Sequence, residues 1–342
     1  MYKVGIIGCG KPWRADGATG FGMSHAHAEG YKASADCAIT ALADISEENA
    51  RAFQERHGGD RIYSDYHAML AEEQLDIVSI STWPHLHAEM VIAAAEAGVK
   101  AVHCEKPMAP TYGESLRMVE ICEAKGCQLT FNHQRRFGAP FIEAKRLLKQ
   151  GVIGDLKRVE GTTGNLFDWG THWFDMLIFY NDENPVQWVI GQIDLRGTEK
   201  VFGVPIEGHG LSHFLFQNGV EGLMMTGVGA FGTLTNRLIG TDGTIEVGHS
   251  NEVPLRYWGQ GMTGWQAVEV PEGLHPQDAV KRGVLDLVDA LKLGRDPELA
   301  ARRALRATEV IFATYESSRR RARIDLPLDI RDSPLIAMLA EG

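Results

Sequence analysis

The sequence has few cysteines, no excess of positive charge and no long apolar run. Its five cysteines are an odd number and form no Cys-x-x-Cys pair, which argues against a disulfide scaffold and favours reduced thiols. The formal net charge of −11 argues against binding to nucleic acid or to an anionic membrane, because both select clustered Lys and Arg. No apolar stretch approaches the ~18 residues that a membrane-spanning helix needs.

The sequence also lacks a targeting segment and a convincing metal-binding pattern. It opens on "MYKVGIIG", which is typical of a β-strand and not of a signal peptide, so we expect a cytoplasmic protein. Two His-x-His pairs, at residues 25–27 and 85–87, have a spacing that metal ligands sometimes show. No cysteine or carboxylate set with the spacing of a zinc site accompanies them, so we expect no metal.

A glycine is missing from what otherwise resembles a dinucleotide-binding turn. Gly8 and Gly10 directly follow an apolar strand, as the G-x-G-x-x-G fingerprint requires, but position 13 is Trp13. The acidic residue expected ~20 positions on is also displaced, since Asp44 lies 36 residues after Gly8. Removing residues 11–22 restores this spacing and accounts for the missing glycine. We therefore favour an insert over a chance pair of glycines.

A turn of this kind binds a dinucleotide through its backbone. Its N–H groups and those of the following helix N-terminus receive the pyrophosphate. Asp44 can accept hydrogen bonds from both ribose hydroxyls of NAD and would repel the 2′-phosphate of NADP, which predicts NAD as the cofactor. The insert carries Lys11 and Arg14 near its start. It either folds over the phosphates or the nicotinamide, or forms a surface loop, and both alternatives stay open.

The first third of the chain alternates strand and helix patterns. Apolar strands separated by helices predict a doubly wound parallel sheet of the Rossmann type. The strands are expected at 2–8, 37–44, 76–84, 100–107 and 127–133, with helices at 46–58, 85–98 and 112–126. Ser46 is the expected N-cap of the first of these helices, with Glu47 and Glu48 in its first turn.

The pattern changes after about residue 130, where strands become more frequent. Asn218-Gly219 and Asp242-Gly243 lie between apolar runs and predict hairpins within 211–229 and 236–248. Further strands are expected at 156–165 and 185–194, and helices at 139–155, 278–294 and 298–322. This half predicts an α/β domain with an open, mainly antiparallel sheet and helices on one face. We expect an NAD-binding domain over 1–130 and a substrate-binding and oligomerisation domain over 131–342.

Residues 81–107, "STWPHLHAEMVIAAAEAGVKAVHCEKP", closely resemble the signature of the Gfo/Idh/MocA oxidoreductases, the glucose–fructose oxidoreductase and inositol dehydrogenase family. The matching features are Thr82, Pro84, His87, Gly98 and Glu105-Lys106-Pro107, with Trp83 as a small departure. "TFNHQRRFGAPF", "VIGDLKRVEG" and "DWGTHWFDML" extend the resemblance over almost the whole chain. It implies an NAD(P)-dependent oxidoreductase acting on a sugar, cyclitol or related polyol. It also implies a homodimer or homotetramer formed through the second sheet.

Three residues near "DWGTHWFDML" are spaced for one face of a helix. Asp168, His172 and Asp175 follow each other at i, i+4 and i+7. Oxidation of an alcohol needs a base near neutral pH, and His is suited to it. By resemblance, His172 is the base, Asp168 is its partner or a substrate ligand, and Lys106 hydrogen-bonds the reacting hydroxyl. Asp175 would orient or cap.

The remaining site residues follow from the ends of strands and from the resemblance. Asn132, Gln134, Arg135 and Arg136 follow the fifth strand and either grip substrate hydroxyls or a carboxylate, or make backbone and interdomain contacts. Trp169 and Trp173 either wall the sugar or belong to the core. The expected cofactor-binding residues are Gly8, Cys9, Gly10, Lys11, Asp44, Ser81, Thr82, Trp83, His87, Glu105 and Lys106. The expected substrate-binding residues are Lys106, Asn132, Gln134, Arg135, Arg136, Asp168, Trp169 and His172.

Three functions are compatible with this reading. The first is a dehydrogenase that moves a hydride between a secondary hydroxyl and NAD. The second is an NAD-dependent glycosidase, which oxidises a ring hydroxyl, eliminates the aglycone and reduces the ring again. The third is a sugar or redox sensor without turnover, against which Lys106, Asp168 and His172 argue because a sensor needs no base.

Overall fold

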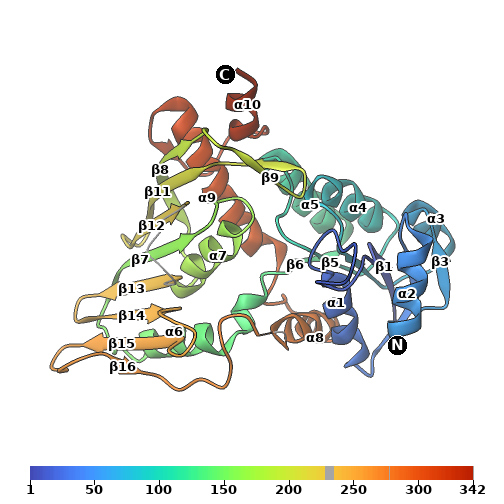
Figure 1. The fold of residues 1–342 in the computed structure, drawn as a ribbon, viewed down its shortest axis with the longest axis horizontal. Helices are drawn as coiled ribbons and strands as arrows, with labels where there is room; N and C mark the ends of the chain where they lie inside the picture. Colours follow the sequence, from blue (N-terminus) through green and yellow to red (C-terminus); the bar gives the residue numbers. More distant parts are fainter. Residues whose placement is uncertain (228–234, 277, 342) are drawn as a thin grey trace. The chain divides into compact units, whose positions relative to one another are not determined.

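The computed structural model describes residues 1–227, 235–276 and 278–341, in two compact units (Figure 1). Unit 1 comprises Met1–Pro110, Glu114–Gln134 and Gln277–Ala304, and unit 2 comprises Thr111–Gly113, Arg135–Pro276 and Leu305–Gly342. The expected division left everything after residue 130 in the second domain, whereas a helix near the C-terminus returns to unit 1. No helix in the described ranges is both long and apolar enough to cross a membrane.

Unit 1 is built on a six-stranded sheet in which every neighbouring pair is parallel. The strand order is β3-β2-β1-β4-β5-β6, so the order reverses between β1 and β4, as in a doubly wound sheet. The predicted Rossmann-type sheet is confirmed. The strands are β1 (Tyr2–Ile7), β2 (Cys37–Ala43), β3 (Arg61–Tyr63), β4 (Ile77–Ile80), β5 (Ala101–Cys104) and β6 (Gln128–Phe131). The sequence pattern missed β3, which has three residues.

The helices of this part of the chain are α1 (Met23–Lys32), α2 (Glu47–His57), α3 (Tyr66–Glu72), α4 (Pro84–Glu96), α5 (Tyr112–Lys125) and α8 (Asp278–Leu293). Four of them, α2, α4, α5 and α8, begin and end close to where the sequence predicts, whereas no range is predicted for α1 and α3. Ser46 caps α2 as predicted, because its hydroxyl accepts a hydrogen bond from Asn49 N. Helix α8 packs on α1, where a Cβ at Gly30 would lie 2.6 Å from Val284 Cβ. This close fit assigns α8 to unit 1.

Unit 2 is built on a nine-stranded, mostly antiparallel sheet. Its order is β16-β15-β14-β13-β7-β12-β11-β8-β17, and the pair β7–β12 is parallel. Both predicted hairpins are present, β11–β12 around Asn218-Gly219 and β13–β14 before Gly243; residues 228 and 229, at the end of the first, lie outside the described residues. The strands are β7 (Leu156–Thr163), β8 (Val186–Asp194), β11 (His209–Phe216), β12 (Glu221–Thr226), β13 (Asn236–Gly240), β14 (Gly243–Val247), β15 (Leu255–Gly259), β16 (Gln266–Ala267) and β17 (Ile324–Asp325).

Helices pack on one face of this sheet, as the sequence predicts. Helix α7 contacts β7 and β12, and α6 contacts β14. All eleven residues of α7 are buried, and the helix contacts β7, β12 and α6 within unit 2. The helical elements are η1 (Gln134–Phe137), α6 (Ala139–Lys149), α7 (Gly170–Tyr180), α9 (Ala301–Arg320) and α10 (Pro334–Glu341), and β9 (Glu199–Val201) pairs with β10 (Val204–Ile206).

Candidate active site

The glycine turn after β1 is held by the carboxylate at the end of β2. Cys9 N and Gly10 N donate to Asp44 Oδ2 at 2.8 and 3.1 Å. Gly8 has a φ of 85°, and a Cβ there would lie 2.8 Å from the carbonyl oxygen of Ser81, so a side chain does not fit. Asp44, although distant in sequence, therefore lies directly beside the glycine turn.

The residues of the proposed insert form a loop whose two ends lie side by side. A Cβ at Gly22 would be only 2.5 Å from the carbonyl oxygen of Lys11. Helix α1 begins immediately after Gly22, without a side-chain cap and with no acidic residue in its first turn. Ser24 Oγ then donates to Cys9 O at 2.5 Å, so this buried hydroxyl ties α1 to the turn where the third glycine of the fingerprint would lie.

The loop itself carries two exposed aromatic rings. Trp13 is 53% exposed and lies 6.1 Å from the ring of Phe21, and the Arg14 guanidinium lies 4.0 Å from the Trp13 ring centroid. Lys11 Nζ donates to the carbonyl oxygen of Asp16 and lies 3.8 Å from Glu48. These contacts leave both alternatives for the loop open.

The first His-x-His pair is divided between two different networks. His25 Nδ1 lies 2.7 Å from His57 Nε2, and burial lowers the pKa of both rings, that of His57 to about 4. His27 contacts Ser79 and Glu105 instead. Among the described residues no group of three or more His, Cys, Asp or Glu side chains is arranged to hold a metal ion.

A buried network lies directly before Lys106 in the chain. His27 Nε2 donates to Glu105 Oε1 at 2.9 Å, and Asn132 Nδ2 donates to the same oxygen at 2.6 Å. Burial raises the pKa of Glu105, but the hydrogen bonds and charge of His27, the Asn132 amide and the charge of Lys106 outweigh it and lower the pKa to about 2. Glu105 is therefore an anion at the carboxyl end of β5. The sequence pattern missed His27 as its partner.

His87 connects two segments that carry predicted cofactor residues. Its ring is fully buried, with Nδ1 2.9 Å from Pro107 O and Nε2 3.2 Å from Thr82 O. Burial lowers its pKa. The ring therefore contacts the backbone of two segments, at Thr82 and at Pro107, and helps to fix the segment that follows Lys106. Trp83, at the start of α4, is 44% exposed.

In unit 2 a buried glutamate holds the segment that leads to Asp168. Glu207 Oε1 accepts hydrogen bonds from Leu166 N at 2.6 Å and from Thr226 Oγ1 at 3.2 Å, and Tyr315 Oη donates to Glu207 Oε2 at 2.8 Å. Burial raises the pKa of Glu207, and the hydrogen bonds only partly offset this. No motif in the sequence points to Glu207, because its partners lie up to 108 residues away.

Asp168 and His172 are both buried at the start of α7, at 3% exposure each. Asn165 Oδ1 accepts a hydrogen bond from Asp168 N at 2.7 Å and so fixes the turn before the helix. Helix α7 covers Gly170–Tyr180, so His172 lies on it as the spacing predicts, whereas Asp168 lies in the turn before it. Trp169, between them, is 37% exposed.

The two adjacent arginines of η1 have different surroundings. Arg136 is buried and forms a two-bond ion pair with Asp175, at 2.8 Å for each bond, and a third bond to Glu183 at 2.7 Å. Asp175 therefore binds Arg136, and the pair fixes η1 to α7. Arg135 is also buried, but its hydrogen bonds go to Leu274 O and His275. Gln134 is half-buried.

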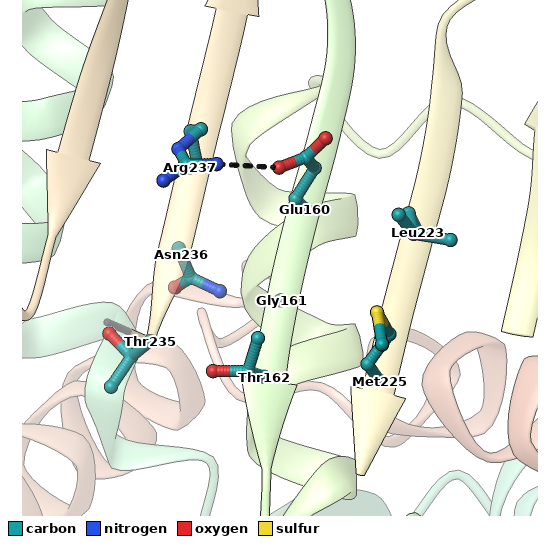
Figure 2. Close-up of a pocket in the computed structure, with 8 residues that line it drawn as sticks. All are labelled: Glu160, Gly161, Thr162, Leu223, Met225, Thr235, Asn236 and Arg237. Atoms are coloured by element: carbon teal, nitrogen blue, oxygen red, sulfur yellow. Dashed lines mark hydrogen bonds and ion pairs between the residues drawn. The ribbon is translucent and has the colours of Figure 1, made fainter. Parts of the chain in front are cut away.

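A separate hollow of about 200 Å³ lies on the sheet of unit 2, over β7, β12 and β13 (Figure 2). Glu160 and Arg237 face each other across two strands there, with an ion pair of 3.3 Å. None of the predicted site residues lines it. The lining residues are Glu160, Gly161, Thr162, Leu223, Met225, Thr235, Asn236 and Arg237.

Comparison with known proteins identifies the N-terminal part. Residues 2–133 match the Gfo/Idh/MocA family, described as an oxidoreductase family with an NAD-binding Rossmann fold. This confirms the resemblance inferred from residues 81–107, and the family description supports NAD as the cofactor.

Two curated relatives each match less than half of this chain. D-apiose dehydrogenase of Paraburkholderia graminis is 36% identical over 153 residues, which are 45% of this chain and 38% of the relative. Myo-inositol 2-dehydrogenase of Thermotoga maritima is 30% identical over 152 residues, 44% of this chain and 42% of the relative. The chain thus spans about two fifths of the length of each of these curated relatives.

The similarity in fold extends over both units. The structure of a levoglucosan dehydrogenase in complex with NADH and levoglucosan superposes with a TM-score of 0.80 and 22% identity, and the match covers 96% of this chain and 100% of that one. At this identity the match establishes the fold alone. Each of the two units therefore has a counterpart of the same fold in that structure.

Proposed function

We propose that the protein is an NAD-dependent oxidoreductase that transfers a hydride between a secondary hydroxyl of a sugar, cyclitol or related polyol and NAD. The match of residues 2–133 to the Gfo/Idh/MocA family, together with a glycine turn held by Asp44, carries this proposal. The names of the relatives, an apiose and an inositol dehydrogenase, support the class of substrate.

The residues of unit 1 fit a dinucleotide. At Gly8 a Cβ would occupy the space beside Ser81, and the N-terminus of α1 has neither a side-chain cap nor an acidic residue in its first turn, which suits a pyrophosphate. Asp44 would accept hydrogen bonds from the ribose hydroxyls in place of those from Cys9 N and Gly10 N. When bound, the nicotinamide supplies the hydride acceptor.

The chemistry of this chain's residues follows from their types. His172 takes the proton of the substrate hydroxyl while the hydride leaves the same carbon, so the alcohol becomes a carbonyl. Lys106 donates a hydrogen bond to that oxygen and stabilises the negative charge that develops there. Asp168 orients the imidazole and stabilises its protonated form. Glu105, which is ionised, places a negative charge at the position directly before Lys106 in the chain.

The test of this mechanism is the turnover of two variants. Lys106→Ala and His172→Ala should each lower kcat by about 100-fold or more, the usual scale for acid–base groups. NADH formation at 340 nm is followed with NAD and a panel of polyols, inositols and glycosides. Normal turnover by both variants contradicts the mechanism. Release of an aglycone without net NADH would replace the dehydrogenase by the glycosidase.

We also propose that the chain forms a homodimer or homotetramer through the sheet of unit 2. Ile190 and Leu211 are 47% and 43% exposed, on the face of β8 and β11 opposite to the buried Val189 and Phe214. Large apolar side chains gathered on one exposed sheet face support contact with a second copy.

All five cysteines are free, which supports the expected cytoplasmic location.

Light scattering after size exclusion tests this assembly. Leu211→Glu combined with Ile190→Glu should shift the particle to the mass of one chain, because charges would be buried in the interface. Leu293→Glu, at a site 72% exposed on α8, is the matched control and should keep the wild-type mass. An unchanged mass for the double variant places the interface elsewhere.

A further inference from the structure

Arg135 is a buried cation that has no carboxylate partner among the residues that the structure describes. Its side chain is 4% exposed, and Nη1 donates to Leu274 O at 2.8 Å and contacts His275 Nδ1 at 3.0 Å. The guanidinium lies over the ring of Trp173, 4.2 Å from its centroid. Nε is buried without a hydrogen-bond partner among the described residues. Carbonyl, imidazole and indole groups are all uncharged acceptors or π faces.

The neighbouring arginine shows what a compensated cation looks like in the same protein. Arg136 has two carboxylates, Asp175 and Glu183, on its three guanidinium nitrogens, and they keep its pKa above the usual value despite burial. Arg135 has no carboxylate partner in the described ranges, and burial alone lowers its pKa to about 9. Because a buried charge without a counter-ion is costly, such a group normally has one when the protein is at work.

His275, Trp173 and Trp169, the described side chains of this cluster, carry no negative charge. Burial, followed by the charge of Arg135, lowers the pKa of His275 to about 4, so this ring is neutral near pH 7. Trp173 belongs to the first turn of α7, where the helix dipole places positive partial charge. Trp169, whose ring is 6.4 Å from that of His275, is partly exposed beside this cluster. Arg135 is thus a buried cation stacked on Trp173, the residue that follows His172 in α7.

We propose that Arg135 binds a carboxylate of the substrate, so that the substrate is a polyol acid such as a uronate or an aldonate. A planar guanidinium matches a carboxylate through two parallel hydrogen bonds, and Nε has a free donor. One uncompensated cation matches a group of one negative charge better than a phosphate ester, which carries nearly two. The inference deepens the proposed function and rests on it for the reaction, but not for the binding.

Matched pairs of substrates test the charge. With NAD, kcat/KM is measured for glucose against glucuronate, galactose against galacturonate, and sorbitol against gluconate. The wild-type protein should favour the acid of at least one pair by about 100-fold, the scale of a buried charge-assisted contact. Arg135→Gln should abolish this preference, and Arg135→Lys should keep part of it. Arg295→Gln, an exposed site, is the control and should leave the preference unchanged.

Binding without turnover separates this inference from the proposed function. With NADH present, quenching of tryptophan fluorescence by glucuronate, gluconate, glucose and inorganic phosphate is titrated for the wild-type and Arg135→Gln proteins. Arg135-dependent binding of an acid supports the inference even if no NADH forms with any polyol, an outcome that would reject the proposed dehydrogenase alone. Equal binding of acid and neutral sugar, preference for phosphate, or equal weakening of both members of a pair overturns it.

Folding of the variant is checked in the same experiment. Because the ligand-free arginine is uncompensated, Arg135→Gln should unfold within a few degrees of the wild-type temperature. An acid that binds should raise the unfolding temperature of the wild-type protein and not that of Arg135→Gln. A variant that fails to fold in the absence of ligand, together with an Arg135→Lys protein showing no preference for acids, assigns Arg135 to stability and contradicts the proposal.

Discussion

Two buried glutamates, one in each unit, differ in the kind of groups that surround them. Glu105 in unit 1 accepts hydrogen bonds from His27 and Asn132 and precedes Lys106, and these groups lower its pKa to about 2. Glu207 in unit 2 accepts hydrogen bonds from a backbone N–H, a threonine and Tyr315, and burial raises its pKa. The two are similarly buried, at 7% and 2% exposure.

This difference shows that charge near a buried carboxylate, more than burial itself, decides its state. Hydrogen bonds from neutral donors satisfy the oxygens of Glu207 but do not offset the loss of hydration of an anion. In unit 1 the same residue type, placed next to a lysine and a histidine, becomes a stable anion. The first network can therefore set the electrostatics at Lys106, while the second serves to position the segment before Asp168.

The largest expected effect on stability comes from Glu105→Gln. The amide keeps one acceptor oxygen but removes the buried negative charge that His27 and Lys106 stabilise, which should lower the free energy of unfolding by about 3 kcal/mol. Urea unfolding of the full chain at neutral pH measures it. Glu123→Gln, which removes a surface ion pair with Arg302 in the same unit, should cost less than about 1 kcal/mol. If Glu105→Gln and Glu123→Gln lower the free energy of unfolding equally, Glu105 is not a strongly stabilising buried anion, and its contrast with Glu207 is lost.

Lowering the pH should remove most of the stability difference between the wild-type and Glu105→Gln proteins. Because the pKa of Glu105 is lowered in the folded state, its contribution is present above the ordinary value of 4.5 and is lost as the pH falls toward about 2. The stability gap between the wild-type and Glu105→Gln proteins should shrink by more than half between about pH 5 and pH 3. Urea midpoints across this range check it. A gap that stays constant would mean that Glu105 is not ionised.

A smaller effect is expected at the glycine turn, where a carboxylate accepts hydrogen bonds from backbone N–H groups. Asp44→Ser should weaken NAD binding by about 10-fold, the scale of a lost hydrogen bond to a charged group, and reduce the discrimination against NADP. Titration of the protein with NADH and NADPH, followed by nucleotide fluorescence, measures both. If the preference for NADH over NADPH is unchanged, Asp44 does not bind the ribose.

The smallest change is expected for Glu207→Gln, and its pH dependence has the opposite sign. An amide can replace a protonated carboxyl between Leu166 N and Tyr315, so the loss near pH 5 should be below about 1 kcal/mol. Because the pKa of Glu207 is raised on folding, the wild-type protein loses stability relative to this variant as the pH rises above 4.5. Between about pH 5 and pH 8 the urea midpoint of Glu207→Gln should therefore rise relative to that of the wild-type protein. The same trend for both glutamates would contradict the comparison.

Activity adds a second readout for this position. If Glu207 positions the segment before Asp168, Glu207→Ala should lower kcat more than it raises the KM for NAD, and Glu207→Gln should restore most of kcat. The pH of the midpoint in kcat should stay where the wild-type protein has it, since Glu207 exchanges no proton with the substrate. A shifted midpoint would place Glu207 among the groups that titrate in the reaction.

Much of the fold and part of the site could be predicted from local patterns. The apolar pattern of the strands, the cap at Ser46, the helical spacing of His172 and Asp175 and both hairpins depend on residues within a few positions of each other. The short strand β3 was missed because three residues carry too little periodicity to detect. The partners of Arg135 and Arg136 could not be predicted, because two adjacent residues of the same type give no signal of which one meets a carboxylate.

The sequence by itself determined the order of strands and helices, the glycine turn with its displaced acidic residue, and the family motif around Lys106. The tertiary structure decided that Asp44 lies beside Gly10, that His27 binds Glu105 across 78 residues, and that α8 returns to α1. The physical reason is the distance along the chain over which each effect acts. Backbone propensity and hydrophobic periodicity act between neighbours along the chain, whereas the charge state of a buried group depends on whichever remote side chains the packing brings within hydrogen-bond distance.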